Sequence, residues 1–162
     1  MLPLRYQGYA IVLEEVPNEI SLAFNISGCP HHCDGCHSQN LWEYKGNLLS
    51  EDIIPIIELY KDYISCVCFM GGDQNIEELK TLCSIVKQKY RLKICIYSGE
   101  DKLDIFQEII HDNNLDYLKL GRYIKEKGGL SKSTTNQIMY KIQKDNIWNI
   151  TPIFQRIKEK EK

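Results

Sequence analysis

Short apolar runs alternate with amphipathic stretches along the chain, and this alternation predicts the fold. Four apolar runs rich in strand formers predict buried strands, at residues 20–27, 64–70, 93–97 and 117–120. Three stretches with apolar residues at helical spacing predict helices, starting near Ser50, over 76–90 and over 102–111. Ser50 precedes two acidic residues and is the expected N-cap of the first helix. The order of elements predicts an α/β protein with a parallel sheet.

An unusual loop follows each predicted strand. These loops begin at the cysteine-rich segment 28–37, at Gly71-Gly72-Asp73, at Ser98-Gly99 and at Gly121-Arg122. The carboxyl ends of parallel strands share one edge of a sheet, and ligands of α/β proteins bind there. We therefore expect the four loops to form a single cleft.

The apolar pattern weakens after about Tyr123. Residues 126–150 predict a long polar loop followed by an edge strand near 138–142, and the charged residues 155–162 predict a solvated, frayed tail. The sequence has no internal repeat and no break in composition. We expect a single domain over 1–162, with its core at about 18–125.

Composition and charge narrow the class of protein. A chain of 162 residues with 43% hydrophobic content can form one core, and the net charge of −2 gives no field that would attract nucleic acid or an anionic membrane. No apolar run approaches the roughly 20 residues that span a bilayer, and the first residues lack a charged segment followed by an apolar one. We expect a cytoplasmic protein.

Three of the seven cysteines form a compact motif. Cys29, Cys33 and Cys36 are spaced as CxxxCxxC in one loop after a predicted strand, which is too tight for a disulfide framework and indicates metal ligation in a reducing compartment. A 4Fe-4S cluster usually takes four thiolates, so three ligands would leave one iron open. The alternative is a zinc site that recruits a nearby histidine, from among His31, His32 and His37.

The other four cysteines fall on predicted core faces. Cys66 and Cys68 alternate on the second strand, Cys83 lies on the second helix and Cys95 on the third strand. Buried thiols usually behave as small hydrophobic groups, so we expect packing roles. An auxiliary cluster is the alternative that the sequence leaves open.

Several motifs together resemble a known family. They are Cys-Pro-His-His-Cys-Asp-Gly-Cys at 29–36, Gly-Gly-Asp at 71–73, Tyr-Leu-Lys-Leu-Gly at 117–121, Gly-Gly-Leu at 128–130 and Thr-Thr-Asn-Gln at 134–137. The cysteine motif resembles that of the radical S-adenosylmethionine (SAM) enzymes. The whole set, over about 5–142, resembles the activating proteins of anaerobic ribonucleoside-triphosphate reductase.

This resemblance implies a fold and a reaction. The fold would be a partial, open βα barrel with parallel strands. The cofactors would be SAM and a 4Fe-4S cluster with three cysteine ligands and one open iron. The reduced cluster would cleave SAM to a 5′-deoxyadenosyl radical, which would take a hydrogen from a glycine of the large reductase subunit. A small flavodoxin or ferredoxin would supply the electron.

The resemblance also implies roles for individual residues. Cys29, Cys33 and Cys36 would hold the cluster, and the cofactors would leave no need for a separate catalytic side chain. Further contacts to SAM would come from residues at three loops: Gly35, Cys36 and His37 on the adenine side, Gly71, Gly72 and Asp73 at the methionine end, and Ser98 as a polar contact. The chain departs from the family pattern in having Asp73 where Glu is usual and Gly35 where an aromatic residue is usual.

Two other functions remain open. Another small radical SAM enzyme, such as a formate-lyase-type activase or an enzyme of the deazapurine pathway, would share the same core. A non-enzymatic zinc-binding module would be colourless after anaerobic purification, whereas an iron–sulfur protein would be brown.

Overall fold

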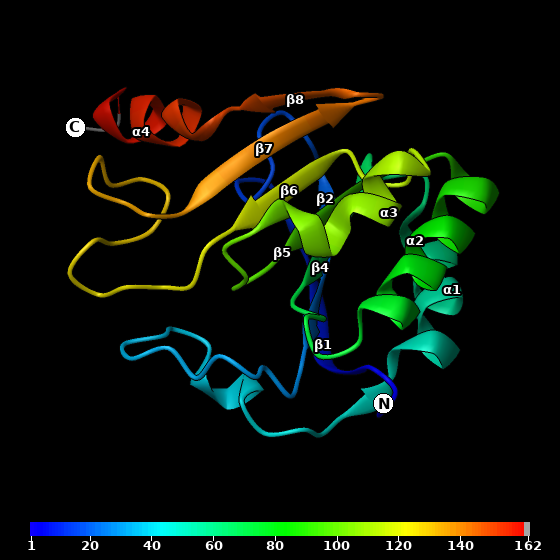
Figure 1. Cartoon of the computed structure of the whole chain (residues 1–162). Coiled ribbons are helices and arrows are strands. Elements are labelled where there is room, and N and C mark those ends of the chain that lie inside the picture. The colour runs from blue at the N-terminus through cyan, green and yellow to red at the C-terminus, as the bar shows by residue number, and fades with distance from the viewer. Residues whose placement is uncertain (161–162) are drawn as a thin grey trace.

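The computed structural model describes residues 1–160; residues 161 and 162 lie outside it. The chain forms an eight-stranded mixed sheet in the order β3-β1-β2-β4-β5-β6-β7-β8 (Figure 1). The strands are β1 Arg5–Val12, β2 Ser21–Ile26, β3 Asn47–Leu48, β4 Cys66–Met70, β5 Lys93–Tyr97, β6 Tyr117–Leu120, β7 Ile138–Gln143 and β8 Asn146–Asn149. The predicted α/β class is confirmed.

The four predicted buried strands form the centre of the sheet. β2, β4, β5 and β6 are parallel neighbours, so their carboxyl ends meet at one edge. β1 and β7 flank them in antiparallel orientation, and β3 and β8 pair with β1 and β7. The two end strands leave the sheet open rather than closed on itself.

Three helices cover one face of the sheet (Figure 1). They are α1 Leu49–Tyr60, α2 Ile76–Tyr90 and α3 Gln107–His111. The α2 bounds match the prediction, and Asn75 caps this helix by accepting a hydrogen bond from Glu78 N at 3.1 Å. Two details need correction. Ser50 lies inside α1, whose N-cap is Leu48 without a side-chain cap, and the expected helix over 102–111 is a 3₁₀ turn, Leu103–Phe106, followed by the short α3.

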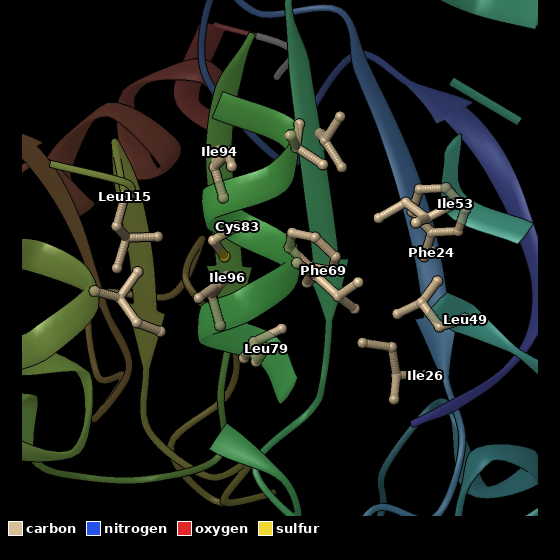
Figure 2. Close-up of a cluster of buried hydrophobic side chains, with 14 of the residues drawn as sticks. Phe24, Ile26, Leu49, Ile53, Phe69, Leu79, Cys83, Ile94, Ile96 and Leu115 are labelled. Carbon is tan, nitrogen blue, oxygen red and sulfur yellow. The ribbon is translucent and has the colours of Figure 1, made fainter. Parts of the chain in front are cut away.

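Large aliphatic and aromatic side chains fill the space between these helices and the sheet. Figure 2 shows Leu79 and Cys83 of α2 near Phe69 of β4 and Ile96 of β5. All four side chains are fully buried. Each fully buried side chain of this kind contributes about 1.5–3 kcal/mol to folding, so this face supplies most of the hydrophobic stabilisation.

The opposite face of the sheet carries smaller side chains. Cys66 and Cys68 of β4, Cys95 of β5 and Met139 of β7 form a second buried cluster there, together with Tyr117. The packing role predicted for these cysteines agrees with their burial. Among the side chains that the structure describes, those of residues 1–156, no group of three metal-binding side chains includes any of these cysteines.

A C-terminal helix, α4 Thr151–Lys160, contributes to this second cluster. The expectation of a frayed tail over 155–162 is therefore corrected for 155–160, and positions 161 and 162 lie outside the described residues. The physical reason lies at the start of the helix. Thr151 N donates to Asn149 Oδ1 at 3.0 Å, and Ile150 and Phe154 pack against the cluster of cysteines.

The sequence pattern also misses β1. Only Tyr6 of this strand is buried, and Gly8, at φ +100°, lies where the pairing with β2 shifts register between Tyr6 and Tyr9. A strand with so few buried residues lacks the apolar run by which strands are predicted. None of the helices described between residues 1 and 160 is long and apolar enough to span a membrane.

Candidate functional site

A cavity of about 180 Å³ opens at the carboxyl ends of the parallel strands. All four loops singled out in the sequence contribute to its lining: Cys29, Cys33 and Cys36 after β2, Gly71 and Asp73 after β4, Ser98 and Gly99 after β5, and Gly121 and Arg122 after β6. The prediction of a single cleft at this edge is confirmed. A larger cavity of about 700 Å³ beside α2 and α3 is lined mostly by polar and charged side chains, with none of the cysteines.

Short hydrogen bonds close the base of the cysteine loop. Ser27 Oγ accepts from Lys45 N at 3.1 Å, and Cys29 N donates to Leu41 O at 3.0 Å. Gly28 has a φ of +78°, and a Cβ there would lie 3.1 Å from the ring of Tyr44. A glycine is therefore required where the chain turns from β2 into the loop.

The three thiols of this loop are half-buried and line the cavity together. Cys36 N donates to Cys33 O at 3.1 Å, which turns the chain between the two cysteines, and Cys36 Sγ accepts from Ser38 N at 3.3 Å. Burial raises the pKa of the Cys29 thiol, while hydrogen bonds from the backbone of His31 and His32 act in the opposite direction. These backbone donors would stabilise a metal-bound thiolate.

The histidines of the loop have partners other than the thiols. His31 Nε2 lies 2.7 Å from Asp73 Oδ2. The His32 ring stacks on Trp42, with centroids 4.7 Å apart, and His37 packs against Tyr123 at 5.6 Å. None of the three joins the cysteines in a group of metal-binding side chains among residues 1–156. The trio of His31, Asp73 and Glu100 does place ligand atoms within 4.8 Å of one another, as a cation site would require.

Asp73 occupies a central position between the loops. Its Oδ2 accepts from Gly99 N at 2.9 Å as well as from His31. Its Oδ1 has no hydrogen-bond partner among the side chains described, those of residues 1–156, although the Asp73 side chain is only 4% exposed and lines the cavity. Gly99 permits this arrangement, because a Cβ there would lie 2.5 Å from the His31 ring.

The predicted site residues fall into two groups. The cavity is lined by Cys29, Cys33, Cys36, Gly71, Asp73 and Ser98. The other three are outside its lining: Gly72 packs beneath it against Leu79, Gly35 lies against Lys125, and His37 lies against Tyr123. Ser98 is buried, and its hydroxyl accepts from Glu100 N at 2.9 Å.

Lys119 and Trp42 are among the lining residues to which sequence reasoning gave no role in the site. Lys119 interrupts the otherwise apolar strand β6, which is a signal that could have identified it, because a charge inside a central strand needs a reason to be there. Trp42 also lines the cavity, and its Nε1 is buried without a partner in the described chain. Nothing in the spacing of the sequence marks Trp42 as part of the site.

The matches to known proteins include the residues that line the cavity. Residues 20–143 match a family model described as a 4Fe-4S single cluster domain. A Haemophilus influenzae protein named anaerobic ribonucleoside-triphosphate reductase-activating protein is 29% identical over 133 residues, which covers 73% of this chain and 85% of that protein. No solved structure gives a significant match. The resemblance to these activating proteins is confirmed.

Proposed function

The chain belongs to the 4Fe-4S single cluster domain family, and on that premise we propose that it is a radical SAM activase that generates a glycyl radical on anaerobic ribonucleoside-triphosphate reductase. The observation that carries the proposal is the convergence of three thiols and the half-satisfied Asp73 carboxylate on one cavity. The name of the Haemophilus influenzae relative supports the choice of reductase.

The thiols suit an iron–sulfur cluster better than zinc. Cys29, Cys33 and Cys36 do not all lie within 4.8 Å of one another in the described chain. Thiolates bound to one tetrahedral zinc ion would be only about 3.8 Å apart. The wider spacing favours a larger metal group held by three cysteines, and so does the engagement of the His31, His32 and His37 rings with other side chains.

Two unsatisfied polar atoms of the cavity support SAM as a ligand next to the cluster. Asp73 Oδ1 and Trp42 Nε1 are buried polar atoms without partners in the described residues, and a ligand in the cavity would satisfy them. We assign Gly71, Gly72 and Asp73 to the methionine end of SAM and Ser98 to a polar contact. We assign Gly35, Cys36 and His37 to the adenine side, where contacts from the backbone would suffice.

The cofactors supply the bond chemistry. Cys29, Cys33 and Cys36 would hold the cluster, which would supply the electron for reductive cleavage of SAM and so allow removal of a hydrogen atom from the reductase glycine. The chain orients the reactants and excludes water, for which the apolar wall of Ile26, Leu41 and Met70 is suited. No side chain needs to act as a general acid or base.

The open sheet would admit the partner. We propose that residues 1–162 form one radical SAM domain whose sheet is the partial barrel of that class. Its unclosed side would receive the glycine loop of the reductase, because hydrogen transfer requires near contact between the reacting atoms. A flavodoxin or ferredoxin in the cytoplasm would supply the electron.

Two assays on anaerobically reconstituted protein test the proposal. The first measures 5′-deoxyadenosine formed from SAM under reducing conditions. The second measures the glycyl radical of the reductase by electron paramagnetic resonance. We expect 5′-deoxyadenosine from the wild type and a glycyl signal only when the reductase is present. SAM cleavage without a glycyl signal would contradict the choice of partner, and a protein without a cluster would contradict the enzyme class.

A further inference from the structure

We propose that segment 122–132, which follows β6, is the docking surface for an acidic protein that carries one electron to the cluster. We call it the basic segment. This inference rests on the proposed function and extends it to a surface for which neither the sequence analysis nor the comparisons indicate a partner. In each cycle the carrier would lose one electron and the oxidised cluster would gain it, which the reductive cleavage of SAM then uses.

The basic segment carries an excess of positive charge. It contains four cations and one carboxylate, which are Arg122, Lys125, Lys127 and Lys132, and Glu126. The chain as a whole has a net charge of −2, so the excess is local. All four cationic residues are exposed, and none of them forms an ion pair with a carboxylate of residues 1–156. The basic segment therefore presents uncompensated positive charge to a partner.

This charge lies directly beside the proposed cluster ligands. Lys125 and the ring of Tyr123 cover Gly35, because a Cβ there would lie 3.4 Å from Lys125 Cδ and 3.5 Å from Tyr123 Cε1. Gly35 separates the second and third cysteines of the motif in the chain. Tyr123 also packs against His37, with ring centroids 5.6 Å apart. The basic segment and the cysteine loop thus lie together at the same end of the sheet (Figure 1).

The electron needs an approach of its own, because the proposed function already uses the cavity and the open side of the sheet. SAM would occupy the cavity, and the glycine loop of the reductase would enter from the unclosed side. The exposed part of the cysteine loop offers a third approach. His32, Asp34 and His37 are exposed in it, and the three thiols are only half-buried. A carrier resting on the basic segment would reach the cluster across this loop.

The charges specify the kind of partner. With Asp34 of the neighbouring cysteine loop counted beside Glu126, the surface has four cations against two carboxylates, so it complements an acidic protein. Complementary charges speed the encounter of two proteins and orient them. Three of the four cations are lysines, whose hydrated ammonium on a flexible stem suits a contact that forms and breaks quickly. A carrier that must leave after each electron fits such a surface.

The test compares matched charge reversals at opposite ends of the sheet. One double variant, Lys125→Glu with Lys127→Glu, alters the basic segment. The control, Lys141→Glu with Lys144→Glu, changes the net charge equally at two other exposed lysines. Lys141 pairs with Tyr117 at the start of β6, so the control lies away from the loop that follows this strand. The probe is a reduced flavodoxin of acidic isoelectric point, and stopped-flow absorbance measures its oxidation by anaerobically reconstituted protein.

The basic-segment variant should react slowly with this carrier. We expect its second-order rate constant to fall about tenfold or more at low salt, since electrostatic steering accelerates association by about tenfold to a thousandfold. The difference from the wild type should shrink at about 0.5 M salt, where exposed charges are screened. Binding of the oxidised flavodoxin, measured by isothermal titration calorimetry, should weaken in the same variant. The control variant should stay within about threefold of the wild type in both measurements.

A neutral reductant separates docking from damage to the site. Photoreduced deazariboflavin carries no charge for the basic segment to attract, so SAM cleavage driven by it should change less than about twofold in either variant. The milder pair Lys125→Gln with Lys127→Gln guards against a fault in folding. This pair should give an intermediate loss with flavodoxin and none with deazariboflavin.

The outcomes separate this inference from the proposed function. Equal losses in the two double variants, or a wild-type rate that is insensitive to salt, would overturn the docking surface and leave the enzyme class intact. A variant that binds the reductase less tightly but flavodoxin as well as the wild type would assign the basic segment to the reductase instead, and so also overturn the inference. A wild type without a cluster would contradict the proposed function, and this inference with it.

Discussion

The two faces of the central sheet carry different side chains, although the same strands form both faces. Toward the helices, β4 and β5 direct Val67, Phe69, Ile94 and Ile96 into the larger core. Toward the other side, the alternate residues include Cys66, Cys68 and Cys95, which are smaller. Successive side chains of a strand point to opposite faces, so one sequence specifies both surfaces.

The second face leads directly into the candidate site. Along β5, Cys95 is followed on this face by Tyr97, and along β6, Tyr117 is followed by Lys119. Tyr97 and Lys119 both line the cavity. The helix-covered face therefore stabilises the fold, whereas the opposite face packs against the C-terminal helix and, toward the carboxyl ends of its strands, lines the cavity of the candidate site.

The largest difference is expected between replacing a cysteine proposed to hold the cluster and replacing a cysteine that packs in the core. Cys36→Ala should abolish both the cluster and SAM cleavage, because two remaining thiolates cannot hold three irons of a cluster. Cys68→Ala, on the second face of the sheet, should keep its full iron content. The measurement is iron and sulfide per chain after anaerobic reconstitution. Loss of iron in Cys68→Ala would mean that the second face holds metal and does not merely pack.

The next largest difference is expected in stability, between substitutions at two neighbouring residues of β4 that lie on opposite faces of the sheet. Phe69→Ala should lower the free energy of unfolding by about 3–5 kcal/mol, because it leaves a cavity in the larger core. The adjacent Cys68→Ala removes only a sulfur atom and should cost much less. Urea denaturation of the metal-free proteins measures both. Similar losses for the two variants would contradict the assignment of stability to the helix-covered face.

A smaller effect is expected from a substitution that weakens SAM binding without lowering the stability of the fold. Asp73→Asn keeps the shape of the side chain but removes its charge, so SAM affinity should fall by about 1.5–3 kcal/mol. Iron content and the midpoint of urea denaturation should stay near those of the wild type, and Glu43→Gln, an exposed change, serves as the control. Unchanged SAM affinity in Asp73→Asn would remove Asp73 from the binding site.

The smallest effect concerns pH. Burial, with the hydrogen bond to Asp52, raises the pKa of Tyr6 on the helix-covered side to about 12, and burial raises that of Tyr117 on the other side to about 12. An unfolded tyrosine ionises near pH 10, so both tyrosines stabilise the fold fully below pH 10. This contribution falls as the pH rises from 10 toward 12. Tyr6→Phe and Tyr117→Phe should each reduce the loss of stability measured between about pH 9 and pH 11.

Sequence patterns predicted the buried part of the molecule well. β5 and β6 have the predicted bounds because both are short apolar runs ended by a polar or glycine loop. β1 and β8 were missed because most of their residues are exposed or half-buried, so no apolar run marks them. α4 was missed because its packing depends on contacts with Met139 and other distant residues.

The site was predictable where a local motif marks it. Cys29, Cys33 and Cys36 carry their chemistry in their spacing, and Gly71 and Asp73 follow a recognisable strand. Lys119 lies in the Tyr-Leu-Lys-Leu-Gly motif, but it reaches the cavity only because β6 lies beside β5, and Trp42 does so only because the cysteine loop folds back on itself. Such contacts follow from the tertiary arrangement, which single-sequence patterns do not contain.

Mössbauer spectroscopy of protein reconstituted with ⁵⁷Fe under anaerobic conditions tests the central claim most directly. If Cys29, Cys33 and Cys36 hold a 4Fe-4S cluster with one iron unbound by protein, adding SAM should shift the signal of a single iron site and leave the others unchanged. A spectrum without such a cluster, or one in which SAM alters no iron, would contradict the account.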